Sequence, residues 1–133
     1  MAGSCGSQYL INTYIMNKFN WKQVREEQVN PQMKRKFIYG EKIMIARMEF
    51  TDGFLVPWHA HDNEQISEVL EGTLRFWFDH DEQNHVDLNP GDSVIIPRNR
   101  PHKALMIGKV IETDTFAPPR QDWIDSSDSY LRK

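Results

Sequence analysis

The sequence predicts an all-β domain in which helix is a small minority. Short runs of apolar or alternating residues recur along the chain, and Gly, Asp, Asn and Pro separate them. This pattern is typical of a sandwich or barrel of short strands. The 133 residues suffice for one domain with a substantial core and are too few for two ordinary domains.

The N-terminal part of the chain is expected to hold an arm and one helix. Residues 1–15 begin with a small, flexible run that includes Cys5, and we interpret them as an arm, a leader or an expression remnant. Residues 16–133 are predicted to form the single domain. Within them, Trp21–Gln28 is the best candidate for a short helix.

Seven short runs are expected to be strands, and polar segments separate them. The strands are Phe37–Tyr39, Ile43–Phe50, Ile66–Leu70, Leu74–Phe78, Val94–Ile96, Ala104–Ile107 and Val110–Phe116. Asp79–Asn84 predicts a hairpin loop before Val86–Leu88, so its His80 and the adjacent His85 are interpreted as solvated. Asn89–Asp92 predicts a tight turn, and Gln121–Tyr130 a helical turn or an irregular tail.

Charge and composition exclude several classes of partner. The net charge is −3 and no long basic stripe is visible, so nucleic acid is not expected as a partner. No apolar run approaches the ~20 residues that span a bilayer, and the N-terminus lacks the pattern of a signal peptide. The single cysteine cannot form an internal disulfide, which fits a reducing compartment. A cytoplasmic protein without a membrane partner is expected.

Three histidines in two glycine-flanked stretches predict a metal site. His59 and His61 are two residues apart, and residues i and i+2 of a strand point to the same face. Their imidazoles can therefore converge on one ion. His102 follows a second strand-like run and offers a third imidazole. Open coordination positions at such a site would make it catalytic rather than structural.

The fourth ligand depends on which face of the next strand turns inward. If residues 64–70 form a strand, Gln65 shares one face with Ser67 and Val69, whereas Glu64 and Glu68 lie on the other face. A carboxylate ligand from Glu64 or Glu68 would require Gln65 to point away. The two alternatives remain open from parity alone.

The two stretches resemble the two motifs of the cupin superfamily. The first motif reads Gly, five residues, His-x-His, three or four residues, Glu, six residues, Gly; the second reads Gly, five residues, Pro-x-Gly, two residues, His. The matching positions are Gly53, His59, His61, Gln65, Gly72, Gly91, Pro97, Asn99 and His102. Gln65 replaces the commoner Glu, and Asn99 replaces Gly but tolerates left-handed backbone.

This resemblance implies a fold and a cofactor. The fold is a single-domain cupin, a double-stranded β-helix or jelly-roll barrel, over about residues 40–118, with a short N-terminal helix. The family register implies one divalent transition metal ion on His59, His61, Gln65 and His102. Zn, Ni, Fe, Mn and Co all suit imidazole and amide ligands. Such cupins frequently pair, so a homodimer is expected.

Gln at this motif position is similar to the pectin-degradation proteins that linearise unsaturated uronates. In that branch an Asp, a Phe and an Arg line the site, and Asp114, Phe116 and Arg120 match their spacing, although Glu68 stands where an aromatic residue is expected. The resemblance implies that Asp114 and Arg120 are catalytic and that Phe116 and Arg120 bind the substrate. The expected protein is a metal-dependent isomerase that opens 4,5-unsaturated uronates from pectin or alginate, with a small acidic substrate.

Asp114, Phe116 and Arg120 could also have purely structural roles, and the protein could have another function. Asp114 could end a strand, Phe116 could be packing and Arg120 could lie on the surface of the tail. The alternative functions include those of other metal-dependent cupin enzymes, namely an Fe(II) dioxygenase or a lyase that acts on a small acid. A non-enzymatic sugar-binding cupin is a further alternative, which would bind its ligand without consuming it.

Overall fold

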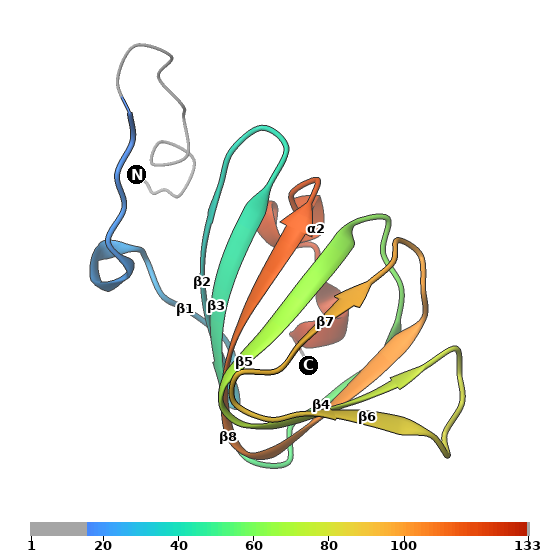
Figure 1. Cartoon of the computed structure of the whole chain (residues 1–133). Helices are drawn as coiled ribbons and strands as arrows, with labels where there is room; N and C mark the ends of the chain where they lie inside the picture. The colour runs from blue at the N-terminus through green and yellow to red at the C-terminus, as the bar shows by residue number, and fades with distance from the viewer. Residues whose placement is uncertain (1–15, 133) are drawn as a thin grey trace.

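The computed structural model describes residues 16–132, so the predicted arm with Cys5 lies outside the described residues. Antiparallel strands make up most of this part of the chain (Figure 1). The elements in chain order are η1 (Trp21–Gln23), β1 (Glu27–Asn30), β2 (Met33–Tyr39), β3 (Met44–Phe50), β4 (Leu55–His59), β5 (Glu64–Phe78), β6 (His85–Leu88), β7 (Ser93–Ile96), β8 (His102–Ala117), α2 (Gln121–Ile124) and η2 (Ser129–Leu131).

Two long strands, β5 and β8, belong to both layers of the fold. The second half of β8 pairs with β3 and with the first half of β5, and this layer continues into β2, β1 and β7. The first half of β8 pairs with β4 and with the second half of β5, which in turn pairs with β6. The result is the expected all-β jelly-roll barrel, with α2 and η2 (red) at its open end (Figure 1).

Four of the predicted short strands are in fact two long, bent strands. Ile66–Leu70 and Leu74–Phe78 both belong to β5, and Ala104–Ile107 and Val110–Phe116 both belong to β8. Gly72 and Gly108, which look like strand breaks in the sequence, have φ values of 81° and 76°. The pairing of β5 with β8 does not end at Gly72 but shifts register between Val69 and Glu71 and again between Glu71 and Thr73. A Cβ at Gly72 would lie 2.2 Å from the carbonyl oxygen of Lys109, so glycine allows the close approach at this bend.

The predicted helix over Trp21–Gln28 is also wrong. Only Trp21–Gln23 forms a single 3₁₀ turn, and Glu27–Asn30 pairs with β2 as an edge strand. Pairing with a neighbouring strand outweighs the local helical pattern here. The hairpin loop, the tight turn and the tail follow their predictions: β5 ends at Phe78, Asp92 N donates to Asn89 O at 2.8 Å, and residues 121–131 hold two short helical turns.

Side-chain alternation along the strands places the core inside the barrel. Alternate residues of β5 from Gln65 to Val69 are buried, and alternate residues of β8 behave likewise. The most completely buried apolar side chains are Met33, Met44, Ala46, Val69, Leu74, Ile96, Met106, Val110 and Phe116. No helix among residues 16–132 is long and apolar enough to cross a membrane.

A buried ion-pair network ties the C-terminal segment to β1 and β2. The Arg35 side chain is fully buried, and its Nη1 lies 2.9 Å from Asp128 Oδ2 while its Nη2 lies 3.0 Å from Glu27 Oε1. Arg132 Nε lies 2.6 Å from the other oxygen of Asp128. The Arg35 guanidinium also lies 4.3 Å from the ring centroid of Trp123. The network therefore fixes the segment that follows β8.

Asp128→Asn is expected to lower the free energy of unfolding by about 3 kcal/mol, because it leaves the Arg35 charge buried without its full partner. Urea titration followed by circular dichroism measures this change. Asp87→Asn is the matched control, since its pair with Arg75 is exposed and contributes at most about 1 kcal/mol. Equal effects of the two substitutions would contradict a stabilising role of the buried network.

Candidate active site

Three imidazoles converge where β4 ends and β8 begins. His59 is the last residue of β4 and pairs in register with His102, the first residue of β8. One ring nitrogen from each of His59, His61 and His102 lies within 4.8 Å of the others. His61 lies beyond the end of the strand, so the argument from strand parity does not describe it. Its carbonyl instead accepts from Asn99 N at 2.7 Å, where Asn99 has the left-handed φ of 63° expected from the motif.

Backbone carbonyls orient all three rings in the same way. The Nδ1 atoms of His59, His61 and His102 lie 2.9, 3.1 and 2.8 Å from the carbonyl oxygens of Pro57, Asn63 and Arg100. In a neutral imidazole, Nδ1 then carries the hydrogen that is donated to the carbonyl, and Nε2 keeps its lone pair. This is the arrangement in which histidine binds metal through Nε2.

Burial disfavours the protonated form of all three rings. Burial and the neighbouring His102 lower the pKa of His59 to about 3. Burial and the positive charge of Arg120 lower the pKa of His61 to about 4, and burial also lowers the pKa of His102. His102 is 2% exposed, and its Nε2 has no hydrogen-bond partner. A buried nitrogen left without a partner fits a metal ligand.

Gln65 completes the cluster, and the neighbouring glutamates do not. Gln65 is 5% exposed and lines the cavity, whereas Glu64 and Glu68 are exposed on the outer face of β5. Gln65 Nε2 donates to Ser67 Oγ at 2.9 Å, which turns Oε1 toward His61 Nε2, also at 2.9 Å. With the His61 hydrogen on Nδ1, two lone pairs face each other. A cation between them resolves this arrangement, so these residues fit a metal.

A pair of buried carboxyl groups lies next to this cluster on β8. Asp114, predicted as a site residue, is 5% exposed and accepts from Ser67 Oγ at 2.5 Å. Glu112 lies two residues away on the same face and hydrogen-bonds to Asp114. Burial raises the pKa of both groups, and the neighbouring Asp114 raises that of Glu112 further, which favours the protonated form of Glu112. The sequence places Glu112 on the face of Asp114, but the spacing match did not select it.

Arg120 lies inside the site and not on the surface of a tail. It is 3% exposed, and its Nε and Nη2 donate to the two oxygens of Asp122 at 3.0 and 2.9 Å. Nη2 also donates to the Tyr130 hydroxyl at 2.6 Å. The guanidinium carbon lies 5.1 Å from the centroid of the Phe116 ring, which is 1% exposed. Asp122 and Tyr130 are contacts that sequence motifs did not reveal.

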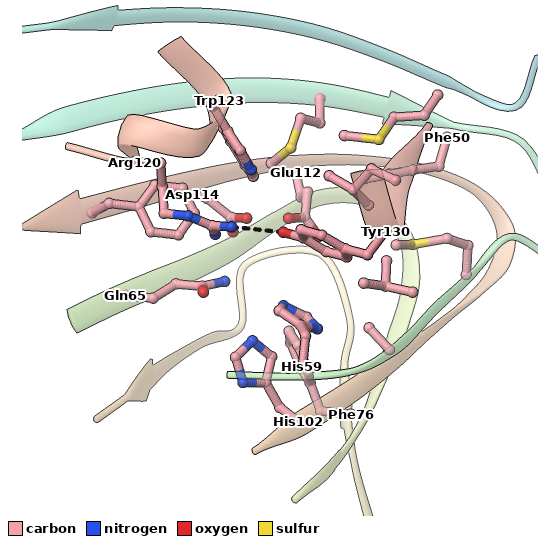
Figure 2. Close-up of a pocket in the computed structure, with 17 residues that line it drawn as sticks. Phe50, His59, Gln65, Phe76, His102, Glu112, Asp114, Arg120, Trp123 and Tyr130 are labelled. Carbon is pink, nitrogen blue, oxygen red and sulfur yellow. Dashed lines mark hydrogen bonds between the residues drawn. The ribbon is translucent and has the colours of Figure 1, made fainter. Parts of the chain in front are cut away.

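One cavity unites most of these side chains (Figure 2). Its predicted lining residues are His59, Gln65, His102, Asp114, Phe116 and Arg120, and it has a volume of about 50 Å³. His61 reaches the cluster from the adjoining loop. Glu112, Trp123 and Tyr130 also line the cavity, and the positions of Trp123 and Tyr130 follow only from the fold.

The remaining polar candidates lie elsewhere on the molecule. His80 packs against the ring of Trp58, and His85 lies in the hairpin beside Asp87, so neither joins the cluster. Arg98 and Arg100 form exposed ion pairs with aspartates. His80 and His85 are both exposed, which agrees with their interpretation as solvated side chains, although His85 begins β6.

About half of this chain matches a known protein family. A family model for the cupin domain matches residues 46–111. The chain contains a cupin domain. The matched range spans β3 through most of β8 and includes all four residues of the cluster formed by His59, His61, Gln65 and His102. The sequence has no match among the curated proteins.

Solved cupin structures resemble this one over most of its length. KdgF from Halomonas sp. has 25% identity and a TM-score of 0.71, with 79% of this chain and 97% of that chain covered. An RmlC-like cupin from Shewanella frigidimarina has 29% identity and a TM-score of 0.71, covering 80% of this chain and 93% of that one. Oxalate decarboxylase from Bacillus subtilis has 15% identity, covers 75% of this chain and 29% of that one, and has a TM-score of 0.66, which shows the shared fold.

Proposed function

We propose that this cupin is a metal-dependent isomerase that opens 4,5-unsaturated uronates to their keto form. The observation that carries the proposal is a single cavity holding a metal-ligand cluster, a buried acid (Asp114) and a buried arginine (Arg120). An acidic sugar needs a cation for its carboxylate and a proton carrier for its ring. The structural similarity to KdgF from Halomonas sp. and the motif resemblance to the pectin-degradation proteins support this substrate class.

His59, His61, Gln65 and His102 would hold a divalent transition metal ion. Such an ion supplies Lewis-acid stabilisation of negative charge on oxygen. Because Gln65 is neutral, the site would keep one more positive charge than a cupin with Glu at this position. That extra charge favours an anionic substrate.

The protein side chains would position the sugar and move its proton. Arg120 offers a guanidinium to the substrate carboxylate, and its edge is oriented by the two hydrogen bonds to Asp122. Phe116 packs against the ring. Asp114 accepts the proton of the anomeric hydroxyl as the bond from the anomeric carbon to the ring oxygen breaks. The electron pair goes to that oxygen and gives an enolate, and Asp114 returns the proton to carbon 4 of this enolate, which leaves a ketone at carbon 5.

The raised pKa of Asp114 suits this exchange. A carboxyl group whose pKa lies closer to neutrality can both accept and return a proton efficiently. Ser67 and the protonated Glu112 hydrogen-bond to Asp114 and hold it in place. These contacts keep the carboxyl group turned toward the cavity.

Incubation with a 4,5-unsaturated monouronate tests the proposal directly. The ultraviolet absorbance of the conjugated double bond is expected to fall much faster than in buffer, and a chelator is expected to abolish the difference. Restoring zinc, nickel, cobalt, manganese or iron in turn identifies the active metal. A rate equal to the spontaneous one in protein of measured metal content would refute the isomerase. Oxygen consumption on iron loading would instead indicate the dioxygenase alternative.

An apolar row on the outside of the barrel supports the expected homodimer. Register aligns Ile38, Ile45, Thr115, Ile66 and Ile95 across five neighbouring strands. Ile66 is 44% exposed and Ile95 is 62% exposed. Ile38, Ile45 and Thr115 are half-buried. Exposed apolar side chains gathered on one face of a sheet are typical of an interface between proteins. A second copy of the chain would bury the row against its own.

Ile66→Lys is expected to convert the dimer to a monomer at micromolar concentration, because it places a charge in the middle of the row. Analytical ultracentrifugation of both proteins measures the change. Val86→Lys is the control, since Val86 is 45% exposed on β6, away from the row. A monomeric wild-type protein, or a dimeric Ile66→Lys variant, would disprove pairing through this face.

A further inference from the structure

A tyrosine of the C-terminal segment lies inside the cavity (Figure 2). The ring of Tyr130 stacks on the imidazole of His59 with centroids 4.9 Å apart and an interplanar angle of 27°. Its hydroxyl accepts the 2.6 Å hydrogen bond from Arg120 Nη2. Tyr130 therefore contacts both a proposed metal ligand and the proposed carboxylate-binding arginine.

The backbone on both sides of Tyr130 is held in place. Asp128 lies in the buried ion pair with Arg35, and Leu131 is 3% exposed. The carbonyl oxygen of Leu131 accepts from Asn30 Nδ2 at 2.6 Å. The position of the Tyr130 side chain thus results from an anchored segment, and a change of its rotamer can clear the cavity while these anchors stay.

The cavity that remains beside Tyr130 is too small for a sugar acid. Its volume of about 50 Å³ accommodates only a few water molecules. Pockets that bind small molecules typically have volumes of at least about 300 Å³. A monouronate can reach Asp114 and Arg120 only if the Tyr130 ring moves away.

We propose that Tyr130 is a gate that determines specificity, because only an acidic ligand displaces its hydroxyl from Arg120. This inference rests on the proposed function. A carboxylate forms a charge-assisted pair with a guanidinium, which is stronger than the hydrogen bond that the guanidinium donates to a neutral phenol oxygen. A neutral sugar gains no such pair and leaves the gate closed. Tyr130 therefore selects acidic sugars before they reach the metal cluster.

Binding of galacturonate, a saturated uronate, tests the gate in two variants. Tyr130→Phe keeps the ring and removes the bond to Arg120, so the dissociation constant measured by calorimetry is expected to fall about tenfold. Tyr130→Ala also frees the volume of the ring and is expected to bind still more tightly. Galactose is expected not to bind to the wild-type protein, but to bind measurably to Tyr130→Ala, in which the gate is absent. Ser129→Ala, an exposed neighbour, is the control and should leave both ligands unaffected.

The possible results separate the gate from the proposed function. Equal or weaker galacturonate binding by both variants, with near-ultraviolet circular dichroism unchanged, would overturn the gate and leave the acidic substrate in place. Galactose binding to wild-type protein as tight as galacturonate binding would overturn the selection of acids. Absence of galacturonate binding in all four proteins would reject the acidic substrate class, and the gate with it.

Discussion

His102→Ala is expected to remove metal from the purified protein and to abolish its chelator-sensitive activity. His102 is the most buried of the three histidines, and its Nε2 has no other partner. Loss of one imidazole from a cluster with three such ligands should lower metal affinity by at least about a hundredfold. Metal analysis by mass spectrometry after dialysis measures the effect.

His85→Ala is the matched control for this loss. His85 lies in the β5–β6 hairpin and takes no part in the cluster, so the variant should keep the metal content of the wild-type protein. Thermal unfolding of both variants shows whether the His102 substitution also damages the fold. If the folded His102→Ala protein retained full metal content, the ion would have to bind elsewhere.

Asp114→Asn is expected to reduce turnover of the unsaturated uronate by about a thousandfold while metal content is unchanged. The amide has the shape of the carboxyl group and can still accept from Ser67 Oγ, but it cannot carry a proton at neutral pH. The loss should therefore appear in kcat rather than in KM. Stopped-flow measurement of the double-bond absorbance gives both constants.

Glu112→Gln is the informative companion to this variant. Its amide can still donate to Asp114, so the proton carrier remains in place and the loss of turnover should be at most about tenfold. Comparable losses of turnover in Asp114→Asn and Glu112→Gln would show that both carboxyl groups are needed for proton transfer. Unchanged turnover in Asp114→Asn would remove Asp114 from the mechanism.

Alternation within strands was the most reliable guide to the site. Period two along β8 put Asp114 and Phe116 on one face, and both are buried in the cavity. The same rule separated Gln65 from Glu64, and the observed burial places Gln65 inside. Motif spacing added His102 from a distant strand. These residues were predictable because pleating leaves the chain only two choices of face.

The bent strands and the helical segment were less predictable for a physical reason. A glycine with positive φ can end a strand or bend it, and the choice depends on the partner strand. At Gly72 the close carbonyl of Lys109 favours the bend. Residues Glu27–Asn30 have a helical sequence pattern but form a strand, because they pair with the free edge of β2. Pairing with a neighbouring strand therefore determined both the bend at Gly72 and the strand at Glu27–Asn30.

The amino-acid sequence, through strand periodicity and its resemblance to the cupin motifs, thus accounts for the barrel, for the four residues of the candidate metal cluster and for the inward face of β8. The tertiary structure alone assigned Glu112 as the hydrogen-bonding partner of Asp114, Asp122 as that of Arg120, and Tyr130 as a side chain above His59. A motif records ligands at fixed separations along the chain. The contact of Tyr130 depends instead on how the C-terminal segment packs across the open end of the barrel, because no local pattern encodes a contact between residues 71 positions apart.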